Sequence, residues 1–171
     1  HDVDAGHTLS YGIAGTVTTG DVQINGITYN VAQDGAYGTA YVNVTNGAYV
    51  YVPDPAKVNA LPAGASPTES FSFTTSDGIA SAVAQTYTIN VTGTNDAPTL
   101  DAITSGSVAD LANSAALGTI ANLSGTLTGH DVDAGHTLSY GIAGTVTTGD
   151  VQINGITYNV AQDGAYGTAY V

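Results

Sequence analysis

The stretch Val22-Gln-Ile-Asn-Gly-Ile-Thr-Tyr-Asn-Val31 carries the clearest fold signal in this chain of 171 residues. Apolar residues alternate with polar ones on both sides of the central Asn25-Gly26 pair. Alternation with a period of two is typical of a strand that buries one face. Two such runs around Asn-Gly predict a β-hairpin, because a type I′ turn needs positive φ at both central positions.

The same alternation recurs in short segments along the chain. The expected strands are 9–13, 22–24, 27–31, 40–44, 49–52, 71–73, 83–91, 123–127 and 138–142. Thr45-Asn46-Gly47 lies between two of them and predicts a second hairpin. Only residues 108–117 show a helical period, and that period is weak. Short strands with turn signals about every ten residues indicate an all-β chain folded as an antiparallel sandwich.

A long internal repeat sets the domain organisation. Residues 1–42 recur without a single change as residues 130–171, at an offset of 129 residues. Such a period is too long for one turn of a solenoid and fits one repeat per domain. The alternation stops at Thr94–Pro98, where proline favours an extended linker. We therefore expect residues 1–97 to be the C-terminal three quarters of one unit and 98–171 the N-terminal part of the next, near-identical unit.

The composition excludes several classes of function. Fourteen acidic residues against one lysine give a net charge of −13, so the chain lacks the basic side chains that bind nucleic acid or anionic membranes. There is no cysteine for a thiolate site, and no apolar run of about 18 residues for membrane insertion. With 43% apolar and 9% charged residues, the chain can still bury a core.

We also expect no enzymatic activity. The sequence contains no Gly-x-Ser-x-Gly elbow, phosphate-binding loop, His-Glu-x-x-His motif or dinucleotide fingerprint. Glu69 is the only glutamate, and the neighbouring Asp131 and Asp133 are too close together to flank a glycosidic bond.

The acidic clusters are the candidate metal sites. Asp131 and Asp133 are two residues apart, so in an extended chain their carboxylates point the same way, and Gly135 lets the backbone turn back. Asp2 and Asp4 form the identical first copy. Two such charges repel unless a cation lies between them, and oxygen ligands without thiolate suit Ca²⁺ best. The alternative is a solvated Asp-Gly turn.

Histidines bracket both aspartate pairs. His130 and His136 flank the second pair, as His1 and His7 flank the first. A transition-metal site with imidazole and carboxylate ligands is one alternative. The other is a set of turn residues that hydrogen-bond the carboxylates locally and titrate mildly beside them. The eleven tyrosines are mostly in expected strands, which favours core packing over a platform for stacking sugars.

Three segments resemble VCBS-type repeats, the cadherin-like domains found in tandem in giant bacterial adhesins. Leu123-Ser-Gly-Thr-Leu-Thr-Gly-His-Asp-Val-Asp-Ala-Gly-His-Thr-Leu-Ser-Tyr-Gly-Ile142 is similar to the opening of these repeats. Residues 69–78 resemble a late strand with its Ser-Asp-Gly turn, and residues 87–98 the closing strand and linker. The family often has an acid where this chain has His136, and often glutamate where it has Asp110.

The resemblance implies an immunoglobulin-like sandwich with Ca²⁺ at the junctions between units, and export across both bacterial membranes in one step. By similarity to cadherin-like junctions, linker residues should meet the aspartate pair of the following unit, and a late turn should approach the pair of its own unit. The implied ligands are Asn95 and Asp96 with Asp131 and Asp133, and Asp77 with Asp2 and Asp4.

The expected function is that of a structural extender repeat in a large extracellular adhesin or fibre at the bacterial cell surface, stiffened by calcium. Its partners would be neighbouring repeats and, through the parent adhesin, other cells or surfaces. Two alternatives stay open: a self-assembling fibre subunit completed by strands of neighbouring chains, and a module that binds carbohydrate or another surface.

Overall fold

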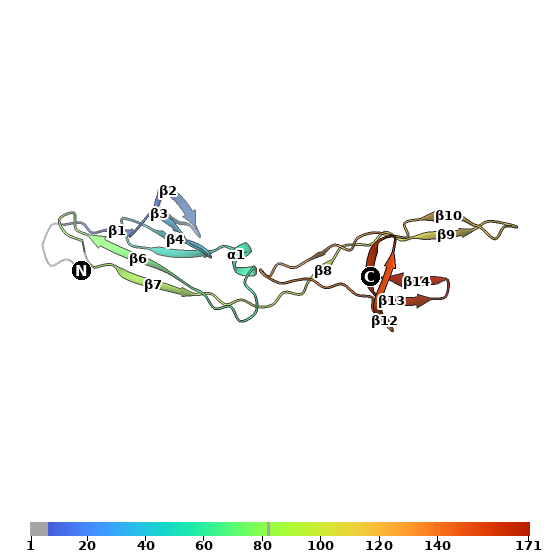
Figure 1. The fold of residues 1–171 in the computed structure, drawn as a ribbon. Coiled ribbons are helices and arrows are strands. Elements are labelled where there is room, and N and C mark those ends of the chain that lie inside the picture. The colour runs from blue at the N-terminus through green and yellow to red at the C-terminus, as the bar shows by residue number, and fades with distance from the viewer. Residues whose placement is uncertain (1–6, 82) are drawn as a thin grey trace. The chain divides into compact units, whose positions relative to one another are not determined.

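The computed structural model of the chain describes residues 7–81 and 83–171 (Figure 1). It divides into two compact units, and the division falls between Asp96 and Ala97. The first unit also includes Val132–Gly135, and the second comprises Ala97–Asp131 and His136–Val171. No helix in the described part of the chain is long and apolar enough to cross a membrane.

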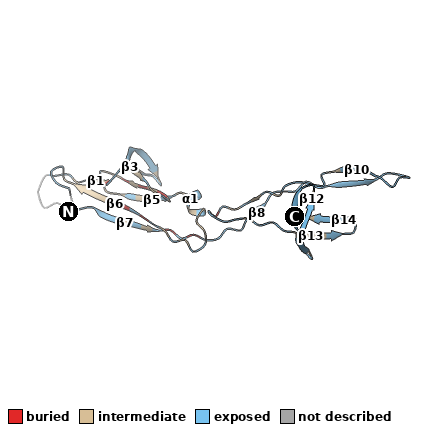
Figure 2. Cartoon of the chain, viewed as in Figure 1, coloured by how far each residue is buried: buried red, intermediate tan, exposed pale blue. Residues whose placement is uncertain are grey.

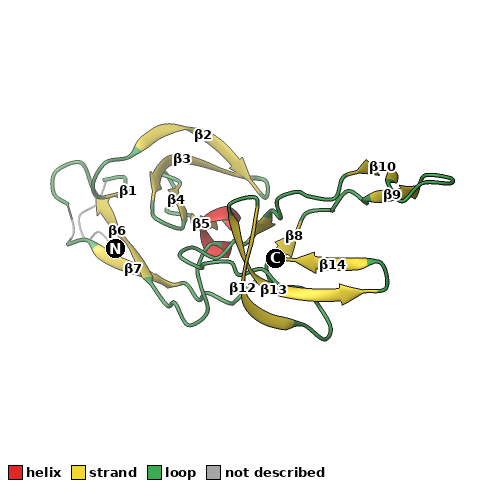
Figure 3. Ribbon diagram, turned by 45° about the vertical axis from the view of Figure 1, so that its right-hand side comes forward, coloured by secondary structure: helices red, strands yellow, loops and turns green. Residues whose placement is uncertain are grey.

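The all-β class is confirmed, with 48% of residues in strands and 3% in helix (Figure 3). The first unit contains β1 (Ser10–Ile13), β2 (Thr18–Ile24), β3 (Ile27–Asp34), β4 (Gly38–Val42), β5 (Tyr49–Pro53), α1 (Pro55–Asn59), β6 (Thr68–Ser76) and β7 (Gln85–Asn90). The second contains β8 (Thr99–Leu100), β9 (Ser107–Asp110), β10 (Leu117–Ala121), β11 (Gly129–His130), β12 (Thr147–Ile153), β13 (Ile156–Gly164) and β14 (Gly167–Tyr170).

Both expected hairpins are confirmed. β2 and β3 pair with Ile24 opposite Ile27, and the turn residues Asn25 and Gly26 have φ angles of 51° and 79°. β4 and β5 pair with Val42 opposite Tyr49, across a turn in which Gly47 has a φ of 74°. In both turns the residues that tolerate positive φ reverse the chain, as the sequence predicts.

The core of the first unit draws on both of its sheets. One sheet has the order β1-β6-β7 and the other β2-β3-β4-β5, and all neighbouring strands are antiparallel. Ile13 of β1, Phe71 of β6, and Ala40 and Val42 of β4 form the buried cluster. The expected faces of β7 are also confirmed, since Ile89 is partly buried while its even-numbered neighbours are exposed.

Several local features differ from what the sequence predicts. The short helix α1 was not expected; Asp54 caps it by accepting a hydrogen bond of 3.0 Å from the Ala56 amide, and Pro55 begins it. The weak helical period over 108–117 does not form a helix, because β9 and β10 pair there as a hairpin. The expected strand 83–91 begins only at Gln85, and Val83 is 86% exposed. The segments 123–127 and 138–142 were expected to be strands, but they are extended without pairing into a sheet.

The second unit is built from small sheets with little burial. Its sheets are β9 with β10, β8 with β11, and the meander β12-β13-β14. All residues classed as buried in the described chain belong to the first unit, and the second unit is coloured almost wholly as exposed (Figure 2). Its apolar side chains therefore cover one another far less than the same residue types do in the first unit.

Candidate metal centre

The loop from Asp131 to His136 follows β11 and gathers three possible ligands. Gly135 has a φ of 84°, which reverses the backbone at this point. One carboxylate oxygen each of Asp131 and Asp133 and one imidazole nitrogen of His136 lie within 4.8 Å of one another. The aspartate pair and the glycine turn thus bring together groups that the sequence places within six residues.

Asp133 is the anchored member of this cluster. It is only 4% exposed, and its Oδ2 accepts a hydrogen bond of 2.9 Å from the Asp96 amide. The next amide, of Ala134, donates to the carbonyl oxygen of Ala60 at 3.0 Å, just after helix α1. The first bond fixes the loop through the Asp133 carboxylate and the second through the Ala134 backbone. A hydrogen bond to a charged carboxylate is stronger than one between neutral groups.

Asp131 and His136 form the second contact of the loop. His136 Nδ1 lies 3.4 Å from Asp131 Oδ2, and the side chains are 37% and 10% exposed respectively. A protonated imidazole makes this contact an ion pair, whereas a neutral imidazole can donate or accept a hydrogen bond there. The nearby His130 pairs instead with Asp101, at 3.1 Å between Nε2 and Oδ1.

A linker residue contacts the loop through its backbone. Asp96 approaches Asp133 through its backbone amide. The Asn95 side chain donates locally to the Asp96 carbonyl oxygen at 2.8 Å, and both linker residues are exposed. The predicted ligand roles of these two side chains stay a prediction.

Asp77 lies in a tight turn of the first unit. Its Oδ1 accepts hydrogen bonds from the amides of Ala80 at 2.7 Å and Ile79 at 2.8 Å, and these bonds lower the pKa of its carboxyl group. Its Oδ2 lies 3.9 Å from His7 Nδ1. The predicted approach of Asp77 to Asp2 and Asp4 falls outside the described residues, because both of those aspartates do.

His136 is the member of the cluster that the expected ligand set omitted. Its spacing from Asp131 and the intervening Gly135 were the available signal, because a reversal there returns residue 136 toward residue 131. An imidazole at this position adds one possible metal ligand to the two carboxylates.

The donor set is suited to a hard cation but does not complete its coordination. Asp131 and Asp133 together offer at most about four carboxylate oxygens. Calcium takes about six to eight oxygens, so water or carbonyl oxygens would have to supply the rest. Zinc and similar ions accept imidazole together with carboxylate, and for them the three side chains leave about one of four positions open.

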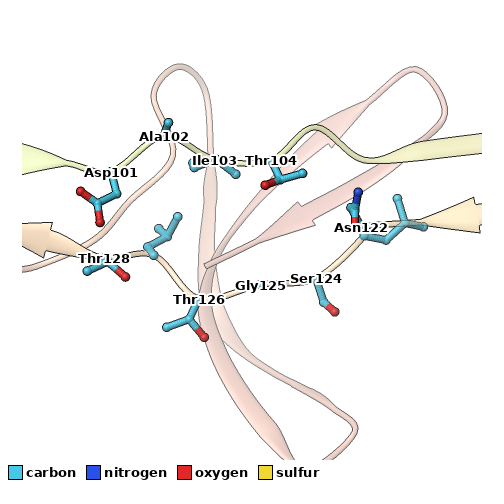
Figure 4. A pocket seen from close by; sticks show the side chains of 11 residues that line it. Asp101, Ala102, Ile103, Thr104, Asn122, Ser124, Gly125, Thr126 and Thr128 are labelled. Carbon is cyan, nitrogen blue, oxygen red and sulfur yellow. The ribbon is translucent and has the colours of Figure 1, made fainter.

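A separate hollow lies in the second unit. Two extended segments, 101–104 and 122–128, line a space of about 490 Å³ (Figure 4). Among its lining residues there is no aromatic ring on which a sugar could stack.

Comparison of the chain with protein-family models, with curated proteins and with solved structures found no match.

Proposed function

We propose that this chain is a structural extender segment of a large extracellular adhesin or surface fibre of a bacterium, and that calcium stiffens it. In this proposal the units are immunoglobulin-like or cadherin-like sandwiches repeated with a period of 129 residues. The neighbouring repeats are the immediate partners, and cells or surfaces are reached only through the parent adhesin. The alternatives of a self-assembling subunit and a carbohydrate-binding module remain to be distinguished by experiment.

The single observation that supports calcium binding is the cluster in loop 131–136. Its three ligand atoms lie within 4.8 Å of one another, and Asp133 also holds the linker amide of Asp96. A cation between the carboxylates would remove their mutual repulsion. The same cation would fix Asp133, and with it the linker residue that donates to it.

The expected affinity for calcium is that of extracellular calcium-binding modules. Extracellular calcium modules typically have dissociation constants of about 10⁻⁴ to 10⁻³ M. A site of that kind is empty at cytosolic calcium levels and filled outside the cell. The linker would therefore become ordered only after export, and the net charge of −13 would keep the chain soluble until then.

The test is a calcium titration of the whole chain, followed by thermal melting and small-angle scattering. At about 100 times the dissociation constant, a bound ion adds about 2.7 kcal/mol to the free energy of unfolding. We expect a higher melting temperature and a narrower distribution of particle lengths. Asp131→Asn with Asp133→Asn should abolish both responses, because asparagine keeps the hydrogen bond from Asp96 but loses the charges.

The matched control is Asp150→Asn with Asp163→Asn. It removes the same number of charges from exposed positions of strands β12 and β13, so it should leave the response to calcium intact. If the unsubstituted chain does not respond to millimolar calcium, or if both double variants respond alike, the calcium proposal is wrong.

One observation favours zinc instead of calcium in this loop, namely the imidazole of His136 beside Asp131. Titration with zinc separates the two chemistries. If His136→Ala removes zinc binding and leaves calcium binding unchanged, the carboxylates hold calcium and the histidine is dispensable. If only zinc binds, and His136→Ala abolishes it, the loop is a transition-metal site and the calcium mechanism does not apply.

A further inference from the structure

Three aromatic rings lie against one another in the first unit. Tyr49 belongs to β5, Phe73 to β6 and Tyr87 to β7. The ring centroids of Tyr49 and Phe73 are 5.0 Å apart, those of Tyr49 and Tyr87 5.4 Å, and those of Phe73 and Tyr87 6.0 Å. Aromatic rings at such separations are in direct contact. Two tyrosines therefore touch, although β5 and β7 belong to different sheets.

The two tyrosines of this cluster meet edge to face. Their ring planes make an angle of 64°. Tyr87 packs against the buried core, whereas the Tyr49 side chain is 55% exposed. An exposed side chain changes rotamer within picoseconds to nanoseconds, which is fast compared with most chemical steps. The pair thus combines one ring that the core holds with one that can turn against it.

The composition makes tyrosine the side chain from which an oxidant takes electrons. The sequence has eleven tyrosines and contains no cysteine, methionine or tryptophan. Cysteine and methionine are common targets of oxidation, and here neither competes with the phenol rings. The lack of cysteine also means that no disulfide can link the two sheets.

We propose that Tyr49 and Tyr87 become joined by a dityrosine cross-link when the chain meets hydrogen peroxide and a haem peroxidase. Each phenol loses one electron and one proton, and peroxide takes up both electrons and both protons to become two molecules of water. The two phenoxyl radicals form a carbon–carbon bond between ring positions next to the oxygens. The proton on each bonded carbon then moves to a phenolic oxygen, which restores both aromatic rings.

Two other tyrosine pairs are in ring contact among the described residues, and both are less suited to coupling. Tyr29 and Tyr41 lie 6.2 Å apart, and their counterparts Tyr158 and Tyr170 lie 6.1 Å apart. Each pair sits on two strands that are already hydrogen-bonded to each other in one sheet. Tyr29 is only 4% exposed, so it has little freedom to turn. Both the distance and the mobility of the rings therefore favour the pair that joins β5 and β7.

The cross-link should stabilise the first unit in the way a disulfide does. It closes a loop that runs from β5 through α1 and β6 to β7. A covalent link of this kind restricts the unfolded chain and thereby favours the folded one. The effect does not depend on calcium, because neither tyrosine belongs to loop 131–136.

The test is treatment of the dilute whole chain with a haem peroxidase and hydrogen peroxide. The monomer is then isolated, and its dityrosine fluorescence is measured. Mass spectrometry of a digest locates the link. We expect a peptide that joins residues 49 and 87, in a yield that does not change with protein concentration, because both rings belong to one molecule. The oxidised monomer should also melt at a higher temperature than the untreated one.

Phenylalanine variants provide the matched controls, because they keep the ring and remove only the hydroxyl group. Tyr49→Phe and Tyr87→Phe should each remove most of the dityrosine fluorescence of the monomer and the rise in its melting temperature. Tyr41→Phe, in the more distant pair, should retain both. Circular dichroism before oxidation checks that all three variants are folded. The proposal is overturned if the digest shows no link between residues 49 and 87, or if Tyr49→Phe and Tyr41→Phe lose equal fluorescence.

Discussion

The hydroxyl group of Tyr51 donates a hydrogen bond of 2.6 Å to Oε2 of Glu69, the only glutamate of the chain. The other carboxylate oxygen, Oε1, accepts from the Tyr37 amide at 3.1 Å. Glu69 is 8% exposed, and a side chain at Gly35 would overlap with its carboxylate. The first unit thus surrounds one acid with a phenol, an amide and a glycine, at the edge of its core.

Removing this acid should cost stability. Glu69→Ala leaves the partly buried Tyr51 hydroxyl and Tyr37 amide without their acceptor, which costs at most about 1–3 kcal/mol for each group. Urea unfolding followed by tyrosine fluorescence measures the loss. Ser70→Ala is the control, because Ser70 is an exposed neighbour on the same strand and should change stability by no more than about 0.5 kcal/mol. Equal effects of the two substitutions would contradict this account.

Tyr51 should also make the first unit sensitive to alkali. Burial, and then the hydrogen bond to Glu69, raise the pKa of its hydroxyl group above the usual value of about 10. A raised pKa gives stability that is fully present below about pH 10 and is lost as the pH rises beyond it. The Tyr51→Phe variant has no hydroxyl group to ionise at this position. Its melting temperature should therefore fall less than that of the unsubstituted chain between about pH 9 and pH 11. Parallel curves for the parent and the variant would refute the assignment.

Ala40 and Ala169 are equivalent positions of the two identical segments, so substitutions there test the difference in burial between the two units. Ala40→Leu forces a larger side chain into a position with 0% exposure, and overpacking typically costs about 1–3 kcal/mol. Ala169→Leu falls on an exposed position and should change stability by no more than about 0.5 kcal/mol in dilute solution. Chemical denaturation of the two variants measures the difference. A similar loss in both would mean that the second meander is covered as well as the first.

Asp77 should contribute to acid sensitivity. The amides of Ala80 and Ile79 lower its pKa, so its share of stability is present above the ordinary value of about 3.9 and is lost as the pH falls below it. In Asp77→Asn the amide oxygen still accepts both hydrogen bonds but does not titrate. We expect the variant to match the parent at neutral pH and to lose less melting temperature by about pH 3. A variant with the same acid slope would exclude Asp77 as a cause.

Much of the local structure could be predicted, because it depends on neighbours in the sequence. The Asn25-Gly26 turn and the alternation around it are sufficient for the β2–β3 hairpin. The helix α1 was missed because its five residues are too few for a period, although Asp54-Pro55 is a recognisable start. In loop 131–136 the aspartate pair could be identified from the sequence, whereas His136 lies beside it only because the backbone reverses at Gly135.

The repeat separates what the sequence alone determined from what tertiary structure decided. Residues 1–42 and 130–171 have one sequence, and their meanders have one register, because hairpin turns and cross-strand pairs act over short distances along the chain. Their burial differs: Val42 is 2% exposed, while Val171 is only partly buried. Burial depends on strands that pack from elsewhere, here β5 and β6, and no property of the 42 residues by themselves can supply those strands.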